Sequence, residues 1–287
     1  MECRCRNGVF AKLGICKVQG FDDLVRIAEA RDAAAVWDLA VARFAGMGFS
    51  RANYGFTRFR SGQHYGDPAD ALYLTSAGAE FQKHYFRNDF YARTPLFRWA
   101  TQNEGACTWA WVRRDYEAGL LTPDEAQTVR ENIAIGVRAG ITVSFPETSA
   151  RAKGALGLLA DPGLSEADVE GIFERDRAQL LAVAHVMHLK LLQFPIARRR
   201  TLTARQREAL EWVADGKTAQ DMAAIMAVSP AMIEKHLRLA REVLCVETTA
   251  QAVAKATMLN LIFQRDSGEP AGGRAGDGSK ATAVRNT

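Results

Sequence analysis

Apolar and polar positions follow two different patterns along the chain, and the pattern changes within FPIARRRTLT at residues 194–203. Before this point, segments with the alternation or the short apolar runs of β-strands lie between segments with helical spacing. The predicted strands are NYGFTRF at 53–59, ALYLTS at 71–76, GITVSF at 140–145 and GALGLLA at 154–160. Strands mixed with helices in this way predict a sheet with helices on both faces.

Helical spacing in the same region predicts helices at residues 22–47, 76–86, 122–140 and 165–194. Thr122 is the expected N-cap of the third helix, with Pro123 at its first position. The fourth helix is expected to begin at Ser165, with Asp168 forming a weak capping box. One apolar stripe of this helix should cover the sheet. The stripe beside it, a candidate self-association surface, consists of Leu181, His185, His188 and Leu192. Its two histidines are expected to be helix-face residues rather than metal ligands.

After residue 202 the pattern is entirely helical. Three N-caps are predicted at Thr203, Thr218 and Ser229, and Gly216 should end the first helix. A fourth helix is expected at about residues 249–262. The predicted inward faces are Leu210, Val213 and Ala214; Met222, Ile225 and Met226; Ile233, Leu237, Ala240 and Leu244; and Ala252, Val253, Ala256 and Leu259.

Two short helices joined by a short turn, with a basic second helix, are typical of a helix-turn-helix. The outer face of the third C-terminal helix has Lys235, His236, Arg238 and Arg241. Side chains near the start of such a helix contact base edges, while the basic residues beyond them contact phosphates. The alternative is a small four-helix domain whose charged face is merely solvated.

Composition limits the possible classes of protein. A chain of 287 residues with 48% hydrophobic residues suggests about two globular domains. The net charge of +4 excludes a polybasic protein, so any basic patch must be local. Five scattered cysteines do not form a disulfide framework, and no metal or cofactor site is predicted. Because no membrane-length apolar run and no convincing signal peptide are found, we expect a cytoplasmic protein with no membrane partner.

The C-terminal segment resembles the LuxR-type DNA-binding domain. The resemblance rests on Leu210, Trp212, Gly216–Lys217–Thr218, His236–Leu237 and the run QAVA at 251–254. It implies a DNA-binding surface with Thr218, Ser229, Lys235, His236, Arg238 and Arg241 as candidate contacts to double-stranded DNA. Gln206 departs from the usual glutamate of the family. A glutamine keeps a hydrogen bond without the charge, at little cost if the site is exposed.

The region before the linker is similar to the autoinducer-binding domain, an α/β/α sandwich that holds an N-acyl homoserine lactone. The similarity rests on YFRNDFYARTP at 85–95, on Trp109 and on GVRAGITVSF at 136–145. It implies that the dense aromatic stretch HYFRNDFYARTPLFRW at 84–99 lines a cavity. The alternative is that these aromatic side chains fill a solid core and bind nothing.

Two positions depart from the family pattern. The family has an aspartate before the proline and a tryptophan four residues before the tyrosine, and this chain has Thr94 and Phe81 there. Loss of a charge-assisted hydrogen bond costs roughly 1.5–3 kcal/mol, so we expect an atypical pocket for a different or altered signal, more apolar or aromatic at its head. The candidate ligand-binding residues are Phe81, Tyr85, Phe86, Thr94 and Trp109.

The sequence therefore predicts an α+β protein: a sandwich followed by a four-helix helix-turn-helix domain. The expected division is an extension at 1–20, a sensor domain at 21–194, a linker at 195–201, a DNA-binding domain at 202–264 and a disordered tail at 265–287. We expect a homodimeric transcription regulator controlled by a small-molecule signal. A regulator that needs no ligand, with an N-terminal domain for dimerisation or partner contact only, is the alternative. An enzyme is not expected, because no nucleophile–base pair, metal cluster or phosphate loop is found.

Overall fold

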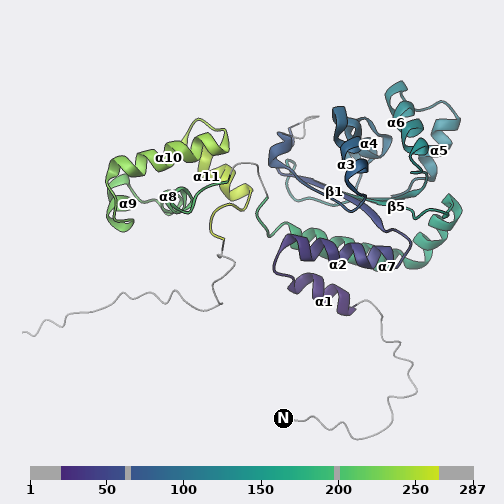
Figure 1. Cartoon of the computed structure of the whole chain (residues 1–287), viewed down its shortest axis with the longest axis horizontal. Coiled ribbons are helices and arrows are strands. Elements are labelled where there is room, and N and C mark those ends of the chain that lie inside the picture. The colour runs from purple at the N-terminus through teal and green to yellow at the C-terminus, as the bar shows by residue number, and fades with distance from the viewer. Residues whose placement is uncertain (1–20, 62–65, 197–200, 265–287) are drawn as a thin grey trace, which may run out of the picture. The chain divides into compact units, whose positions relative to one another are not determined.

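The computed structural model describes residues 21–61, 66–196 and 201–264, except for the side chains of 79, 80 and 86–89 (Figure 1). The chain divides into two compact units, Met1–Thr201 and Leu202–Thr287, which are treated separately below. The predicted extension at 1–20, the disordered tail at 265–287 and residues 197–200 of the predicted linker lie outside the described residues.

The first unit is built on a five-stranded antiparallel sheet with strand order β2-β1-β5-β4-β3. In chain order the strands are β1 (Arg51–Thr57), β2 (Leu72–Thr75), β3 (Gly105–Thr108), β4 (Gly140–Ser144) and β5 (Lys153–Leu159). The four predicted strands are confirmed. β3 was not predicted from the sequence, because GACT is short and has no clear alternation of apolar and polar residues.

Successive side chains of β1 point to opposite faces of the sheet. The rings of Tyr54 and Phe56 contact His188 of α7 (Glu166–Leu191). Asn53 and Thr57 therefore direct their side chains to the other face, and Gly55 leaves that face open between them. Because Tyr54 pairs with Leu156 and Asn53 with Gly157, β5 continues the same division between the two faces.

One face of the sheet is covered by α2 (Ala33–Ala45) and α7, and α1 (Phe21–Glu29) packs on the outer side of these two helices, as Figure 1 shows. The prediction of one helix over 22–47 is wrong, since two helices form there. Asp32 lies between them, and its carboxylate accepts a hydrogen bond from the Ala35 amide at 2.8 Å, which starts α2. The prediction of α7 is confirmed, including the capping box of Ser165 and Asp168.

The second stripe of α7 is partly buried within its own unit. His188 is 2% exposed: its Nδ1 lies 2.8 Å from the Tyr54 hydroxyl and its Nε2 lies 3.1 Å from Glu147 Oε1. Its ring stacks on Phe145 at 4.0 Å. At the end of the helix, Arg58 donates from Nη2 to the Leu192 carbonyl at 3.1 Å. His188 is therefore an interior residue rather than part of a free surface.

Short helices cover the other face of the sheet: η2 (Pro68–Asp70), α3 (Ala79–Phe86), η3 (Arg87–Arg93), α4 (Pro95–Gln102), α5 (Ala110–Glu117) and α6 (Pro123–Ala134). Thr122 and Glu125 form a capping box at the start of α6, as the N-cap prediction implied. The helix ends before the predicted residue 140 because Gly136 adopts φ +77°. Helices on both faces confirm the predicted sandwich.

The second unit has four helices among the described residues: α8 (Ala204–Ala214), α9 (Ala219–Ile225), α10 (Pro230–Leu244) and α11 (Thr249–Met258). The N-caps Thr203, Thr218 and Ser229 and the left-handed Gly216 are confirmed. The core includes Leu210, Met222, Met226, Ile233, Leu237, Ala240, Leu244, Ala252 and Ala256.

Three expectations about this unit are wrong. Ala214 and Ile225 are exposed rather than inward, because each lies in the last turn of a short helix that is already leaving the core. Gln206 is 6% exposed, so its site is not a surface site. Its Oε1 accepts from the Thr203 amide at 2.9 Å, which completes the capping box of α8.

Candidate functional site

A cavity of about 130 Å³ lies on the sheet face that α3, η3, α4 and α6 cover. Its sheet side includes three small residues, Gly55, Ala155 and Gly157. A Cβ at Gly157 would meet only the Asn53 carbonyl oxygen, at 3.9 Å, so the space above this glycine is open. The aromatic stretch therefore surrounds a cavity in the described structure and does not fill it completely.

Four of the five candidate ligand residues line this cavity: Phe81, Tyr85, Thr94 and Trp109. The side chain of the fifth, Phe86, lies outside the described residues. The rings of Phe81 and Tyr85 stack with centroids 5.5 Å apart, and Tyr91 lies 5.9 Å from Tyr85. Burial raises the pKa of Tyr85 to about 12, with a further contribution from Tyr91, so its phenol is neutral at pH 7.

Trp109 is held firmly as part of the cavity wall. Its Nε1 donates to Thr142 Oγ1 at 2.9 Å. A Cβ at Gly140 would lie 2.8 Å from the indole ring and 2.3 Å from the Leu158 carbonyl oxygen, so only glycine lets the ring pack there. Because the single indole N–H is already used, Trp109 offers a ligand its ring surface rather than a hydrogen bond.

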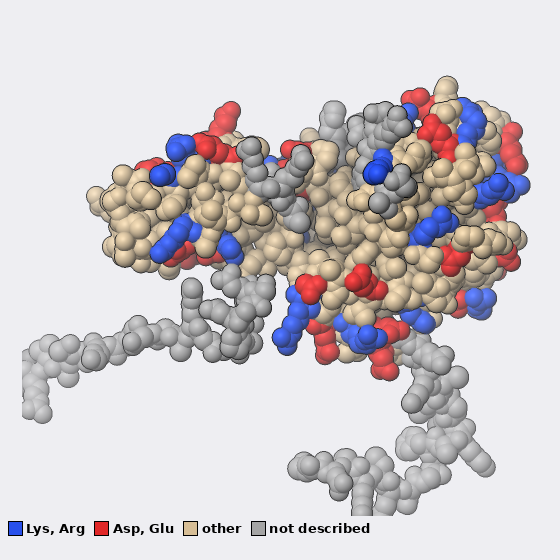
Figure 2. Space-filling view, viewed as in Figure 1, with Lys and Arg blue, Asp and Glu red and all other residues tan. Residues whose placement is uncertain are grey.

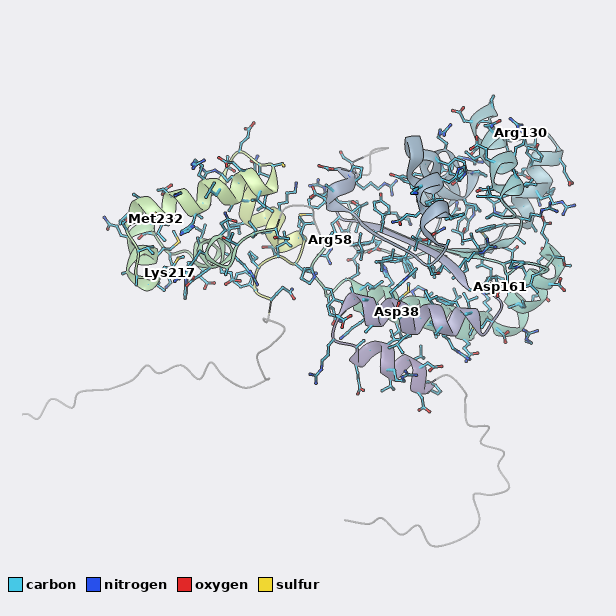
Figure 3. All side chains as sticks on the ribbon, in the orientation of Figure 1. Asp38, Arg58, Arg130, Asp161, Lys217 and Met232 are labelled. Carbon is cyan, nitrogen blue, oxygen red and sulfur yellow. The ribbon has the colours of Figure 1, made fainter. Side chains whose placement is uncertain are left out.

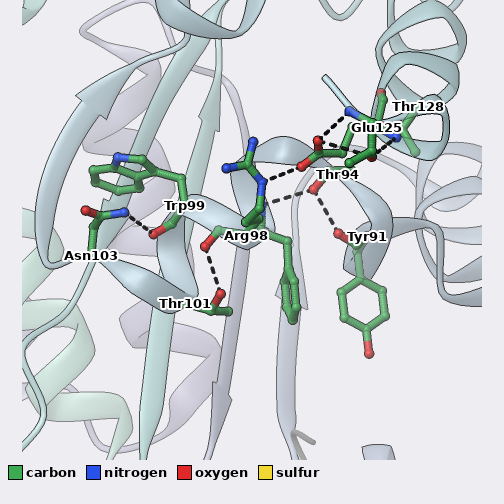
Figure 4. A network of polar contacts seen from close by, with 10 residues as sticks. Tyr91, Thr94, Arg98, Trp99, Thr101, Asn103, Glu125 and Thr128 are labelled. Carbon is green, nitrogen blue, oxygen red and sulfur yellow. Dashed lines mark hydrogen bonds and ion pairs between the residues drawn. The ribbon is translucent and has the colours of Figure 1, made fainter. Parts of the chain in front are cut away.

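Thr94 uses its hydroxyl to start α4. Its Oγ1 donates to the Tyr91 carbonyl at 2.8 Å and accepts from the Phe97 amide at 3.1 Å (Figure 4). The residue is 4% exposed. A hydroxyl has one donor and two lone pairs, so only one lone pair remains for a ligand.

An ion pair between α4 and α6 lies behind Thr94. Arg98 Nε donates to Glu125 Oε1 at 2.6 Å, and Glu125 Oε2 accepts from the Thr122 amide at 3.0 Å (Figure 4). Burial by itself would raise the pKa of Glu125, but the hydrogen bonds from Arg98 and Thr122 outweigh burial and hold the pKa below its ordinary value. This network fixes the position of two helices that bound the cavity.

Several polar residues at the cavity were not identified from the sequence, among them Lys153 and Asn132. Lys153 Nζ donates to the Asn103 carbonyl at 3.2 Å and to the Phe145 carbonyl at 3.4 Å, and burial lowers the pKa of this lysine. Asn132 lies on α6 and lines the cavity as well. Both positions occur in segments whose apolar spacing is that of an ordinary strand or helix, so no pattern distinguished them.

The outer face of α10 exposes Lys235 and Arg238, while His236 and Arg241 are half-buried. Arg238 forms an ion pair with Glu242, one turn further along the helix. Arg241 donates from Nη1 to Thr249 Oγ1 at 2.9 Å, which connects α10 to α11. The basic residues are therefore not folded into the core, although Arg241 has a structural partner.

The remaining two candidates are at helix starts. Thr218 accepts from the Asp221 amide at 3.2 Å and Ser229 from the Met232 amide at 3.4 Å, and both residues are exposed. Figure 3 shows Lys217 and Met232 at the same end of this unit, where α9 and α10 begin. Figure 2 shows lysines and arginines interspersed with acidic residues over the visible face, in agreement with the small net charge.

Within the described residues, no group of three or more histidine, cysteine, aspartate or glutamate side chains is arranged to hold a metal ion. In the same part of the chain, no helix is long and apolar enough to cross a bilayer.

Comparison with known families gives two matches. The autoinducer binding domain matches residues 32–191, and the family described as bacterial regulatory proteins, luxR family, matches residues 200–256. Together the two matches extend over both units.

Individual relatives agree with these matches. The transcriptional activator protein SolR of Ralstonia nicotianae is 29% identical over 202 residues, which cover 68% of this chain and 79% of SolR. The quorum sensing-dependent regulator RpaR of Rhodopseudomonas palustris is 36% identical over 103 residues, 36% of this chain and 40% of RpaR. Escherichia coli SdiA has a similar fold, with a TM-score of 0.50 at 16% identity over 84% of this chain and 96% of SdiA.

Proposed function

The chain belongs to the LuxR family of regulators with an autoinducer-binding domain, and we propose that its signal is a small, largely apolar molecule bound beside Trp109. It is a signal-responsive transcription regulator that binds DNA through its helix-turn-helix, and it is not an enzyme. The observation that supports the proposed site best is the cavity itself, which adjoins four candidate residues chosen from the sequence.

The walls of the cavity favour an apolar or aromatic head group on the signal. Phe81 and Tyr85 present ring surfaces, and the indole N–H of Trp109 is already bonded to Thr142. Thr94 has no charge and a single lone pair to offer. A head group that stacks on aromatic rings gains about 0.5–1.5 kcal/mol per ring pair beyond area burial. Such a signal is either similar to an acyl homoserine lactone or more aromatic than one.

On the DNA side, we assign base contacts to Lys235 and phosphate contacts to Arg238 and Arg241. Lys235 lies in the first half of α10, which enters the major groove in a helix-turn-helix. Thr218 and Ser229 begin α9 and α10, where a hydroxyl and nearby amides approach the DNA backbone. His236 lies beside Lys235 on the same helix.

Signal and DNA binding are coupled through dimerisation in this proposal. A homodimer places two recognition helices on a roughly two-fold operator. The exposed part of α7, including Leu189 at 60% exposure, and the outer face of α11 are the surfaces we assign to the dimer. The signal must bind the dimeric state more tightly than the other state, because equal affinity for both would shift nothing.

Thermal shift against a panel of acyl homoserine lactones, aryl compounds and pyrones tests the signal. A rise in melting temperature with one class, together with tighter operator binding by the same compound, is the expected result. No shift with any compound, combined with full operator binding by the dimeric protein without a signal, would instead favour the ligand-independent regulator.

A further inference from the structure

The first two turns of α10 expose three long side chains of different chemistry. Met232, Glu234 and Lys235 are all exposed, whereas Ile233 between them is buried in the core of the second unit. In an α-helix each Cα–Cβ bond is inclined toward the helix N-terminus. The three side chains therefore extend toward the start of α10, the part of a recognition helix that contacts base edges.

Glu234 is the acidic member of this group, and its carboxylate is not used by the protein. No hydrogen bond or ion pair of this side chain is found among the described residues. Arg238 lies four positions further along the helix, a spacing at which ion pairs are common. It pairs with Glu242, the other acid of α10, instead. Both carboxylate oxygens of Glu234 are therefore available to a group outside the protein.

A free carboxylate on a DNA-binding surface limits what it can contact. Phosphates repel it, and for this reason surfaces that bind the DNA backbone are rich in lysine and arginine. A carboxylate gains from bound DNA only where it meets a hydrogen-bond donor. In the major groove the donors on base edges are the amino groups of cytosine, at N4, and of adenine, at N6. Glu234 is therefore suited to a base rather than to the backbone.

Of these two bases, cytosine matches a carboxylate better. An ionised carboxylate accepts hydrogen bonds and cannot donate one. Cytosine presents only its amino group in the major groove, whereas adenine has the N7 acceptor beside its amino group. Thymine presents the O4 acceptor, and guanine presents two acceptors, N7 and O6. A glutamate at this position should therefore prefer cytosine and disfavour guanine most.

Apolar side chains at the same end of the unit support contact with DNA there. Ile225 is 46% exposed and Met232 is 37% exposed, and they belong to the two helices that meet at the turn. A large apolar side chain gains free energy when it leaves water. The 5-methyl group of thymine is an apolar contact that the major groove provides. The surface around Glu234 thus has groups that favour coverage by base edges.

We propose that Glu234 selects cytosine at one position of each operator half-site by accepting a hydrogen bond from the N4 amino group of that base. The inference rests on the proposed function, because it requires α10 to lie in the major groove. It goes further by naming a base and by adding a specificity-determining residue to those already assigned. Lys235 cannot replace it, because an ammonium group has donors only.

Selection of bound DNA from a pool of randomised duplexes tests this assignment. It uses the full-length protein, together with any compound that raises its melting temperature. Glu234→Ala should lose a preference for cytosine of about fivefold to 150-fold at one position, the value of one base-specific contact, and keep the preferences at other positions. Glu234→Gln should select adenine at that position, because a carboxamide can pair with both N6 and N7.

Glu247→Gln is the matched control. Glu247 is exposed and lies after the end of α10, and no partner of its side chain is found in the part of the chain that the structure describes. The substitution removes the same charge from the same unit, outside the recognition helix. It should change affinity for all duplexes by a similar factor and leave the base preference as in the unmodified protein.

A modified base tests the contact at the level of one group. 2-Pyrimidinone is cytosine without the exocyclic amino group. Placed at the selected position, it should weaken binding of the unmodified protein by the same fivefold to 150-fold and leave the affinity of Glu234→Ala unchanged.

Two kinds of result would overturn the proposal, and they differ in what else they imply. If Glu234→Ala selected the same sequence as the unmodified protein, or if 2-pyrimidinone weakened both proteins equally, Glu234 would have no role in base selection, and DNA binding through α10 would stand. If the unmodified protein enriched no sequence from the pool, the assignment of α10 to base contacts would fail, and the role of Glu234 would fail with it.

Discussion

At the scale of single residues, the polar atoms around the first cavity are largely used by the protein itself. The indole N–H of Trp109 bonds to Thr142, and the Thr94 hydroxyl starts α4. Both residues were candidates from the family resemblance, and both line the cavity. Their partners were not predictable, because Thr142 is 33 positions away in the sequence and only the pairing of β4 brings it close. Asn132 was missed because its segment has the apolar spacing of an ordinary helix.

Arg238 and Arg241 should respond differently to substitution by alanine. Arg238 is exposed and forms an exposed ion pair with Glu242, so Arg238→Ala should reduce the slope of log affinity against log salt by about 1 without loss of stability. Arg241→Ala also removes the bond to Thr249 and should lower the free energy of unfolding by about 1 kcal/mol. Salt titrations of operator binding and urea denaturation measure the two effects.

Thr249→Val separates the two functions of Arg241, since it removes the bond to α11 and keeps the charge. It should lower stability without changing the salt slope.

Lys235→Ala tests the base contact. It should change the binding preference among the four bases at one position of the operator by about 1–3 kcal/mol. An unchanged operator preference would contradict the assignment of Lys235 to base contact.

Glu125→Gln should destabilise the first unit in a pH-dependent way. The ordinary pKa of this carboxyl is 4.5, and the hydrogen bonds from Arg98 and Thr122 lower it in the folded state despite burial. The ionised form therefore contributes stability above pH 4.5, and this contribution is lost as pH falls through the lower folded pKa. At pH 7 the loss should be about 1 kcal/mol, because Arg98 is partly solvated.

Thermal denaturation of the unmodified protein and of Glu125→Gln between pH 7 and pH 3 measures this difference in stability. The melting temperatures should converge as the pH falls. A constant difference over this range would mean that shape, rather than charge, accounts for the effect of the substitution.

At the scale of helices and strands, the sequence was most informative where a cap or a strict period was present. The capping residues Thr122, Ser165, Thr203, Thr218 and Ser229 were all predicted, since a cap depends on neighbours within three positions. The break between α1 and α2 was missed, because apolar spacing continues through it. Short elements such as β3, α4 and α5 form because of tertiary contacts, and they have too few residues for a periodic pattern to be recognised.

A substitution at the C-terminal end of α10 should stabilise the second unit. Cys245 occupies the left-handed conformation at φ 55°, which residues with a side chain adopt at a cost and glycine adopts freely. Cys245→Gly should therefore raise the free energy of unfolding of the second unit by about 0.5–1 kcal/mol. Urea denaturation measures the change.

Cys245→Ala is the control for loss of the thiol, whose Sγ lies 3.8 Å from the Glu242 carbonyl oxygen. It retains the strained backbone and should leave stability nearly unchanged. If the alanine and glycine variants were equally stable, the backbone conformation would not limit this helix end.

At the scale of the whole molecule, each unit has a hydrophobic core of its own. The core of the second unit is drawn from all four of its described helices, including Leu210, Met222, Ile233 and Ala252. The division into two units follows from this arrangement. The sequence indicated this boundary through the change from a mixed strand and helix pattern to an entirely helical one. The residues that form the dimer surface are still a prediction.

A fragment of residues 198–264 should fold without the rest of the chain. It should show a single cooperative thermal transition and bind operator DNA more weakly than the full-length protein, because a monomer engages one half-site only. Circular dichroism and a mobility-shift titration test these expectations. A fragment without a cooperative transition would show that the second unit depends on the first.

The open space above Gly157 has a consequence for how such proteins diverge. A methyl group added there meets one oxygen at 3.9 Å, so the backbone and the surrounding walls can accept it unchanged. Alanine also favours an ordered chain over glycine by roughly 0.5–1 kcal/mol. A single nucleotide change from glycine to alanine at this codon would therefore reduce the volume of the cavity and slightly stabilise the fold. Related proteins could thus acquire different ligand specificities without passing through an unstable intermediate.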